Sequence, residues 1–310
     1  MPLPSDPKLI ALGEDIIAQL DAIFGLHPGF RPVHARGAML TGTFAPTPEA
    51  SALSSAPHFN QPSTPVTVRF SSSTGLPSIP DTDPNANPRG IGLRFNLGEH
   101  LHTDIVAHST PAFPARNGTE FLDFFRALAG GTVEQFLGSH PAALAFVQTP
   151  KPFPTSLAHE GYFALNAFKF TSSAGITRFG RYTIIPDAGL QYLDEVAVKS
   201  KDANYLYDEL SERVANGPIT FHLLCQIAND GDVTDDVTVH WPKDRATVIL
   251  GKLTLTTLVT DKDHDRIIFD PTPRIDGIEE SDDPLFEVRA AVYLMSGRRR
   301  RAAAAASEET

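Results

Sequence analysis

Residues 30–40 read FRPVHARGAML and place one histidine, His34, just before an apolar run that is typical of a β-strand. A lone histidine near a strand is more often a packed or surface residue than a catalyst, so its role depends on its neighbours in the fold. A second predicted strand, TPVTVRFSSSTG at residues 64–75, puts Arg69 and Ser71 on one face by period-two alternation. If that face points toward His34, the Ser71 hydroxyl can bind Nδ1 of the imidazole, which leaves Nε2 as a base.

Eight runs bounded by Pro, Gly, Asn and Asp predict the strands of the chain. They span residues 36–44, 65–72, 91–97, 102–108, 161–171, 176–185, 217–228 and 247–258. Helices are predicted at residues 8–23, 119–129, 132–147, 202–214 and 284–296, the first of them amphipathic and expected to dock on the core. Eight mainly antiparallel strands can close into a barrel whose interior holds side chains or one ligand. We therefore predict an α+β fold, an eight-stranded antiparallel β-barrel with peripheral helices.

The composition narrows the classes of partner. The 310 residues carry a formal net charge of −11, which argues against broad attraction to nucleic-acid phosphates or anionic lipid. The one cysteine, Cys225, lies in the apolar run ITFHLLCQIA and is expected to pack in the core. The sequence has no apolar segment of about 18 residues and no signal-peptide core. We therefore expect a cytoplasmic protein with no nucleic-acid partner and no stable membrane insertion.

Arg289 and Tyr293, in EVRAAVYLMSGRRRR, are four residues apart on the last predicted helix and therefore stack on one face. A guanidinium held against a phenol favours the ionised form by charge proximity. A phenolate is a hard oxygen donor for ferric iron. Taken alone, an Arg-x-x-x-Tyr pair is more often a packing contact than a metal site.

In their joint order these motifs resemble the haem catalase family, and more narrowly its minimal branch of catalase-related peroxidases. RPVHARG is similar to the family's distal-histidine motif, and TPVTVRFSSSTG with DTDPNANPRGIGLRF resembles its arginine-serine strand and the loop that follows. DIVAHSTPAF is similar to the segment of the distal asparagine, and HWPKD with GKLTL resembles the Trp-Pro and Gly-Lys-Leu pieces. FDP, GIE, RAAVY and RRR resemble the proximal-tyrosine region, so the resemblance covers roughly residues 27–301.

The resemblance implies roles for the motif residues. His34 would be the distal acid and base, which takes a proton from the peroxide and returns it to the departing oxygen, and Ser71 would orient it. Tyr293 would ligate the iron of haem b, and Arg289 would keep the phenolate anionic. The other implied cofactor contacts are propionate-binding arginines, Arg31, Arg69 and Arg300, and pocket residues, Val33, Phe113 and Phe121. Arg300 lies two helical turns past Tyr293 if the helix continues through Gly297.

Two features depart from the family pattern. His108 stands at the position of the distal asparagine and is a candidate catalytic residue whose hydrogen bonding depends on its tautomer. The chain also ends nine residues after Arg301, which implies that the carboxy-terminal helical domain of large catalases is lacking and that the haem is easier to approach. The expected organisation is a docked N-terminal helix at residues 1–26, a haem-binding barrel domain at 27–301 and a frayed tail at 302–310.

The favoured function is that of a haem peroxidase that reduces organic hydroperoxides, including those of fatty acids, and hydrogen peroxide, with weak catalase activity. It would need a small-molecule electron donor, and a homo-oligomer is compatible with the resemblance. Arg36 and Arg116 are candidates for binding a fatty-acid carboxylate at the channel mouth. Two alternatives stay open, a fatty-acid hydroperoxide isomerase of the allene oxide synthase type and a non-catalytic carrier of haem or lipid. Val33 argues against the first, because allene oxide synthases carry threonine there, and the acid-base residues argue against the second.

Overall fold

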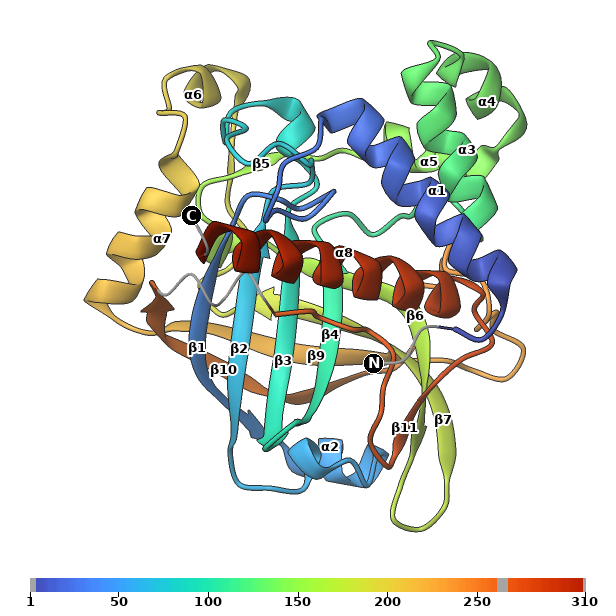
Figure 1. Cartoon of the computed structure of the whole chain (residues 1–310). Helices are drawn as coiled ribbons and strands as arrows, with labels where there is room; N and C mark the ends of the chain where they lie inside the picture. The colour runs from blue at the N-terminus through green and yellow to red at the C-terminus, as the bar shows by residue number, and fades with distance from the viewer. Residues whose placement is uncertain (1–3, 261–266, 309–310) are drawn as a thin grey trace.

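Eight long strands close into an antiparallel barrel in the computed structural model, which describes residues 4–260 and 267–308 (Figure 1). The strands are β1 (Gly37–Pro46), β2 (Thr64–Ser71), β3 (Gly90–Gly98), β4 (Leu101–His108), β6 (Tyr162–Thr171), β7 (Thr177–Pro186), β9 (Ile219–Ile227) and β10 (Thr247–Val259). Their order around the barrel is β6-β4-β3-β2-β1-β10-β9-β7, and pairing of β7 with β6 closes it. The predicted eight-stranded barrel is therefore confirmed. Shorter strands were not predicted: β11 (Ile278–Glu280) pairs with β6, and β5 (Phe153–Pro154) pairs with β8 (Tyr192–Leu193).

Strand β9 shows why these sequences form the barrel wall. Its residues alternate between buried and half-buried positions along the whole strand, as expected when one face lies on a core. The inward residues include Phe221, Leu223 and Cys225, which are fully buried in the main hydrophobic core. Burial raises the pKa of the Cys225 thiol, so this cysteine is a packing residue, as predicted.

The wall is least continuous between β4 and β6. In the described part of the chain a single residue pair joins these strands, His108 opposite Phe163. By contrast, the ladder between β3 and β4 extends from Gly90 opposite His108 to Gly98 opposite Leu101. Among the residues described, β4 and β6 are therefore paired at the His108 end of β4 alone.

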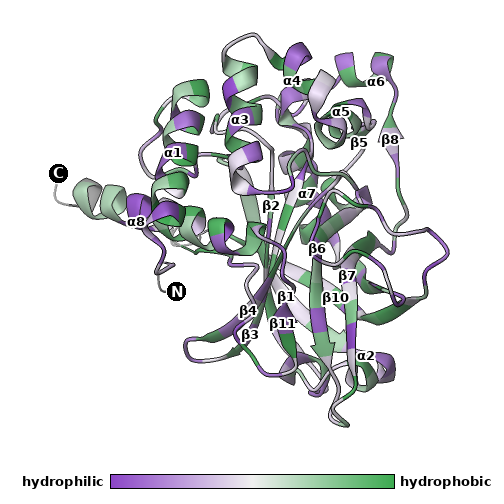
Figure 2. Cartoon of the chain, turned by 90° about the vertical axis from the view of Figure 1, so that its right-hand side faces the viewer, coloured by the Kyte–Doolittle hydropathy of each residue, from purple (hydrophilic) through white to green (hydrophobic). Residues whose placement is uncertain are grey.

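Most of the helices gather at one end of the barrel (Figure 2). Helix α8 (Leu285–Glu308) lies across β1 to β4, and α1 (Pro7–Phe24) lies beside it (Figure 1). Gly13 of α1 allows this close approach, because a Cβ there would stand 3.2 Å from Cβ of Ala291 on α8. The other helices are α2 (Pro48–Leu53), α3 (Gly118–Ala129), α4 (Val133–Ser139), α5 (Pro141–Gln148), α6 (Glu195–Lys199) and α7 (Tyr205–Asn216). None of the described helices is both long and apolar enough to cross a membrane.

Two predicted helices differ from the structure. The stretch 132–147 is two helices, α4 and α5, because Pro141 lacks an N–H and disfavours helical geometry at His140, whose φ and ψ are −125° and 83°. Helix α8 continues past its predicted end at residue 296 and includes Gly297. A glycine is required at this position because a Cβ there would clash with Ile268. The tail that was expected to fray from residue 302 is helical as far as Glu308, since alanine has the strongest helix propensity.

Candidate active site

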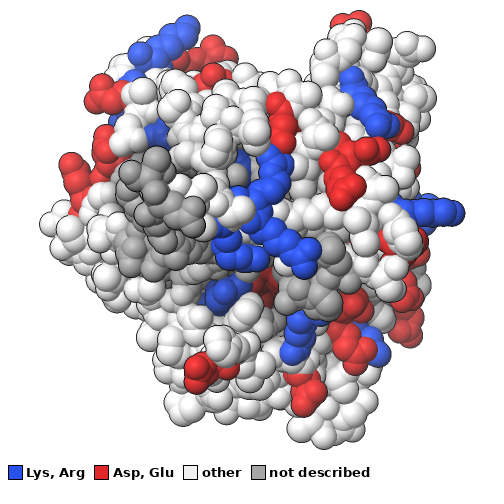
Figure 3. Space-filling view, in the orientation of Figure 1, with Lys and Arg blue, Asp and Glu red and all other residues white. Residues whose placement is uncertain are grey.

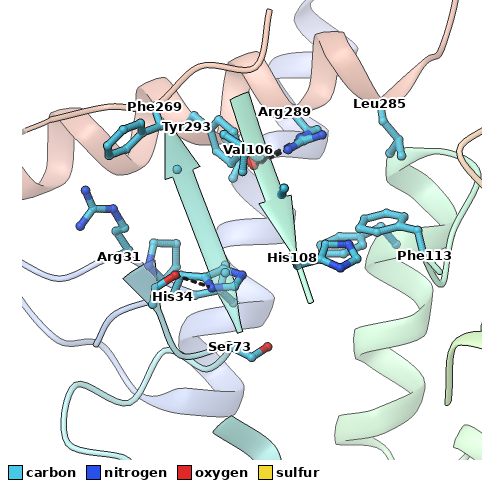
Figure 4. A pocket seen from close by; sticks show the side chains of 18 of the residues that line it. Arg31, His34, Ser73, Val106, His108, Phe113, Phe269, Leu285, Arg289 and Tyr293 are labelled. Atoms are coloured by element: carbon cyan, nitrogen blue, oxygen red, sulfur yellow. Dashed lines mark hydrogen bonds between the residues drawn. The ribbon is translucent and has the colours of Figure 1, made fainter. Parts of the chain in front are cut away.

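A cavity of about 310 Å³ lies between the barrel and the helices α1, α3 and α8. It is lined by every residue for which the sequence implied a catalytic or cofactor-binding role: Arg31, Val33, His34, Arg69, Ser71, His108, Phe113, Phe121, Arg289, Tyr293 and Arg300. These residues come from both ends of the chain and from two strands, β2 and β4, and the closed barrel with α8 across it brings them together. In Figure 4, His34 and His108 lie on one side of the cavity, and Arg289 and Tyr293 lie on the other.

His34 has an uncommon backbone conformation. Its φ is 56°, a left-handed value that costs a residue other than glycine about 1–3 kcal/mol. Hydrogen bonds hold this turn: the N–H of His34 donates to the carbonyl of Ser73 at 3.1 Å, and that of Ala35 donates to Thr74 at 3.0 Å. Nδ1 of the ring then lies 3.1 Å from Oγ of Ser71. The face of β2 that carries Ser71 therefore points toward His34, as predicted.

The surroundings of His34 keep its imidazole neutral. Burial lowers its pKa to about 3, and the charges of Arg69, His108 and two further arginines add to this effect. With Nδ1 bound to the Ser71 hydroxyl, Nε2 is the nitrogen that remains for proton transfer. The ring can therefore accept a proton throughout the neutral pH range.

His108 ends β4 in the cavity wall. Burial lowers its pKa to about 4, and the charge of Arg289 contributes. The N–H of Thr110 donates to Nδ1 at 3.4 Å, which assigns the proton of the neutral ring to Nε2. The ring continues an aromatic row, because its centroid lies 6.1 Å from that of Phe113, which stacks on Phe121 at 5.8 Å. His108 thus presents an N–H donor at the end of an apolar wall.

Arg289 and Tyr293 form a pair on the opposite side of the cavity. Nε and Nη2 of Arg289 both donate to Oη of Tyr293, at 3.2 Å and 3.1 Å. Nη1 donates to Oδ1 of Asn166 on β6, and the amide nitrogen of Asn166 donates to Oδ2 of Asp283 at 2.9 Å. The guanidinium is therefore held from both ends, and two of its donors converge on the phenolic oxygen.

Three further arginines line the cavity wall. Arg31 donates from Nη2 to the carbonyl of Ile267 at 2.9 Å, and Arg300 donates to the same carbonyl from Nη1 and Nη2 at 3.3 Å and 3.2 Å. Arg69 is buried on β2 and donates from Nη2 to the carbonyl of Ala35 at 3.0 Å. Lys and Arg side chains also gather over the part of the surface where α8 lies (Figure 3), although the net charge of the chain is −11. A carboxylate in the cavity would meet positive charge on this side.

The two arginines expected at a channel mouth lie in different surroundings. Arg36 forms an ion pair with Asp81 at 3.3 Å, lies over the ring of Tyr207 at 4.5 Å and does not line the cavity. The expectation for Arg36 is therefore wrong, because its charge is used in a separate polar cluster. Arg116 does not line the cavity either, but it is exposed and pairs with Asp236 at 3.3 Å, and the residue after Asp236 lines the cavity. Of the two, Arg116 alone remains a candidate for binding a substrate carboxylate.

Two glycines of β3, Gly90 and Gly92, shape the cavity, although no site role was predicted for them. A Cβ at Gly90 would stand 2.8 Å from Nδ1 of His34 and 2.7 Å from Oγ of Ser71. Gly92 makes room for Phe269, whose ring would lie 2.9 Å from a Cβ at that position. The signal was in the sequence, since two glycines at period two in a strand indicate close approach of another group. The asparagine that binds Arg289 had no such signal, because one polar residue in an apolar strand does not reveal its partner.

Comparison with known proteins agrees with this site. The sequence model of the catalase family matches residues 29–307. The chain is 34% identical over 282 residues to a catalase-related peroxidase of Mycolicibacterium paratuberculosis, an alignment that covers 88% of this chain and 89% of that protein. It is 32% identical over 297 residues to a catalase-related peroxidase of Synechococcus elongatus, covering 91% and 87%.

Solved structures show the same fold. A fungal catalase superposes with a TM-score of 0.78 at 21% identity, covering 88% of this chain and 59% of that chain. Catalase A from Saccharomyces cerevisiae has a TM-score of 0.78 at 20% identity, covering 88% and 62%. The chain thus spans less than two thirds of these longer catalases, and at such identity the likeness concerns the fold alone.

The fold and the sequence relationships together define an oxidoreductase that acts on peroxide. The chain belongs to the catalase family, whose members are haem enzymes, and it is similar to catalase-related peroxidases along most of its length.

Proposed function

We propose that the protein is a haem-dependent peroxidase that reduces organic hydroperoxides, those of fatty acids among them, in preference to dismutating hydrogen peroxide. The observation that carries this proposal is the placement of two residue pairs across one cavity, His34 with Ser71 and Tyr293 with Arg289. A phenolate can hold ferric haem, and an imidazole on the other side can transfer protons. A carrier of haem or lipid would need no such proton-transfer group.

The donor set of the cavity fits haem b. Oη of Tyr293 would be the iron ligand, and the two hydrogen bonds from Arg289 would stabilise its negative charge. The apolar wall would contact the ring of the haem and three arginines its propionates: Val33, Phe113 and Phe121, with Arg31, Arg69 and Arg300. Bound haem would supply the two-electron redox chemistry between the peroxide and an external reductant.

His34 would move the proton of the hydroperoxide. Its Nε2 accepts the proton of the terminal O–H while Nδ1 stays bound to Ser71, and the same proton then goes to the departing oxygen. The hydroperoxide ROOH leaves as the alcohol ROH, and its other oxygen leaves as water after a reducing small molecule has supplied two electrons and two protons have been taken up. The hydrogen bonds around the left-handed backbone of His34 keep the ring in place for both transfers.

Two features favour organic hydroperoxides over hydrogen peroxide. His108 stands where the family pattern has an asparagine, so the carboxamide that would help to seat hydrogen peroxide is absent from the cavity wall. The cavity wall next to His108 consists mainly of aromatic and aliphatic side chains from α3, α5 and β6. Burying an alkyl chain against such a wall contributes about 0.8 kcal/mol for each CH₂ group, a gain that hydrogen peroxide cannot have.

The test compares kcat/KM for hydrogen peroxide, a small alkyl hydroperoxide and a fatty-acid hydroperoxide in wild type and in His108→Asn. We expect the organic substrates to have the higher values in wild type, and the variant to gain oxygen evolution from hydrogen peroxide. Arg116→Gln should raise KM for the fatty-acid substrate and leave the uncharged alkyl substrate unchanged. A wild type that prefers hydrogen peroxide and evolves oxygen at high rate would overturn the substrate preference, and an isomerised product in place of the alcohol would favour the isomerase.

A further inference from the structure

Arg89 lies beside the cavity without lining it. Its side chain is fully buried, and its guanidinium donates from Nη1 to Oγ of Ser72 at 2.9 Å and from Nη2 to the backbone carbonyl of Asp81 at 2.6 Å. The carboxylate of Asp81 lies 3.8 Å from Nη1, so an opposite charge accompanies the buried cation. The side chain therefore connects the start of β3 with the residue that follows β2.

The backbone of Arg89 connects the same point with β4. Its N–H donates to Oγ of Ser109 at 2.9 Å, and its carbonyl accepts from the N–H of Ser109 at 2.8 Å. Ser109 directly follows His108, and Ser72 directly follows Ser71. Arg89 thus bonds to the neighbour of each of these two cavity residues.

The strand register shows what this arrangement holds in place. Gly90 pairs with Ser71 on one side and with His108 on the other, and it is the first residue of β3. Gly90 also lies against the ring of His34, as the 2.8 Å approach of a Cβ there to Nδ1 shows. The β2–β3 and β3–β4 pairings both end at Gly90. Beyond it, the spacing between the ends of β2, β3 and β4 depends on hydrogen bonds outside the sheet. Arg89 supplies such bonds to both neighbouring strands.

We propose that Arg89 is a positioning residue for proton transfer, which sets the spacing of β2 and β4 so that Ser71 and His108 flank His34. This inference rests on the proposed role of His34 as acid and base. A displacement of about 1 Å at an acid-base group can cost on the order of 10²-fold in rate. A residue that only stabilised the fold would change the melting temperature and the haem content, but not the rate per bound haem.

The main test is a double-mutant cycle of Arg89→Met and His34→Ala, measured as the rate of the first reaction with peroxide per bound haem. Methionine keeps an unbranched side chain and removes the donors. We expect Arg89→Met to slow the reaction roughly 10- to 100-fold in wild type. In the His34→Ala background it should have no further effect, because the group that it positions is absent. Equal losses in both backgrounds, or no loss in wild type, would overturn the inference.

Two variants complete the design. Ser72→Ala removes the acceptor of Nη1 with a smaller change to the core, and it should reproduce the loss if Arg89→Met does not fold. Arg245→Met removes an ion pair with Asp232 at 2.8 Å, in which neither residue lines the cavity, and it should leave the rate per haem unchanged.

A crystal structure of Ser72→Ala measures the positioning without using activity. We expect the distance from Nδ1 of His34 to Oγ of Ser71 to exceed roughly 3.5 Å, the limit of a hydrogen bond. A retained contact would contradict the inference. If His34→Ala alone keeps the wild-type rate, the proposed acid-base role fails, and this distance then decides by itself whether Arg89 positions the ring.

Discussion

The phenolic oxygen of Tyr293 accepts hydrogen bonds from two nitrogens of one guanidinium, that of Arg289, which lies one helical turn earlier on α8. The third arm of the guanidinium is bound to Asn166 on the barrel wall. The guanidinium cannot turn away from the phenol without breaking a contact on each side. The oxygen therefore has a fixed place in the cavity wall and a positive charge beside it.

Replacing Tyr293 by phenylalanine should abolish haem retention or reduce it to a small fraction of the wild-type content. The ring remains for packing, but the oxygen that would ligate the iron is lost. A pyridine-haemochrome assay on purified protein measures the haem content per chain. Tyr182→Phe is the matched control, because Tyr182 is buried in the barrel core and does not line the cavity. Full haem content with an unchanged spectrum in Tyr293→Phe would mean that the ligand lies elsewhere.

Replacing His34 by alanine should leave haem bound and slow the first reaction with peroxide by about 10²–10⁴-fold, the usual effect of a positioned acid-base group. Stopped-flow absorbance measures this rate. Since burial lowers the pKa of His34 to about 3, the wild-type rate should stay constant from about pH 8 to pH 5 and fall only as the pH approaches 3. A variant as fast as wild type would assign His34 to packing, and a midpoint near pH 6.5 would show an unburied ring.

Gly90→Ala should slow the same reaction while the protein stays folded. The new methyl group would stand 2.8 Å from Nδ1 of His34 and 2.7 Å from Oγ of Ser71, so their contact has to open. Gly98→Ala, at the other end of β3, is the control, because the nearest atom to its Cβ is 3.9 Å away on Leu101. We expect the rate to fall at least about tenfold for Gly90→Ala and to remain unchanged for Gly98→Ala. Equal rates would mean that the strand shifts to admit the methyl group.

His58 should make the protein less stable in acid. It is fully buried against Phe95, neither ring nitrogen has a hydrogen-bond partner among the described residues, and burial lowers its pKa to about 3. The unfolded chain, with an ordinary histidine pKa of 6.5, binds the proton more readily, so stability falls as the pH drops below 6.5 and continues to fall toward pH 3. At pH 5 this loss is about 2 kcal/mol.

His58→Leu tests the acid effect directly. The substitution keeps a buried apolar side chain of similar size and removes the titrating group. Denaturant unfolding at pH 7 and pH 5 should show a smaller loss of stability in acid for the variant than for wild type. An identical pH dependence of the two proteins would show that His58 is already protonated or paired in the folded state.

Much of the site was accessible from sequence because its parts are local. The period-two patterns predicted the strands, and spacing of four residues placed Arg289 beside Tyr293 on one helix face. The helix boundaries were harder to predict where two sequence signals disagree. Pro141 divides a continuous apolar pattern into two helices, and Gly297 has the character of a helix end but serves close packing against Ile268.

The partners of the charged side chains could not be predicted from local sequence patterns in the same way. Arg36 and Arg89 are both arginines close to the ends of predicted strands, and each is bound to the Asp81 region in the fold. Which side of the sheet an arginine occupies, and which carboxylate or carbonyl it meets, depends on residues distant along the chain. The sequence made Arg36 a candidate for binding a substrate carboxylate, but the fold places it in a separate cluster with Asp81 and Tyr207.

The sequence by itself predicted the eight long strands and most of the helices, and it placed Arg289 beside Tyr293, because alternation and helical spacing depend on neighbouring residues alone. The order of its motifs made His34, Ser71, Arg289 and Tyr293 candidates for the site. The tertiary structure decided that the two pairs face each other across a single cavity, that Asn166 holds Arg289, and that glycine leaves room for His34. These relationships depend on barrel closure and on the packing of α8 across β1 to β4. Both arise from contacts between residues far apart in sequence, which no local pattern contains.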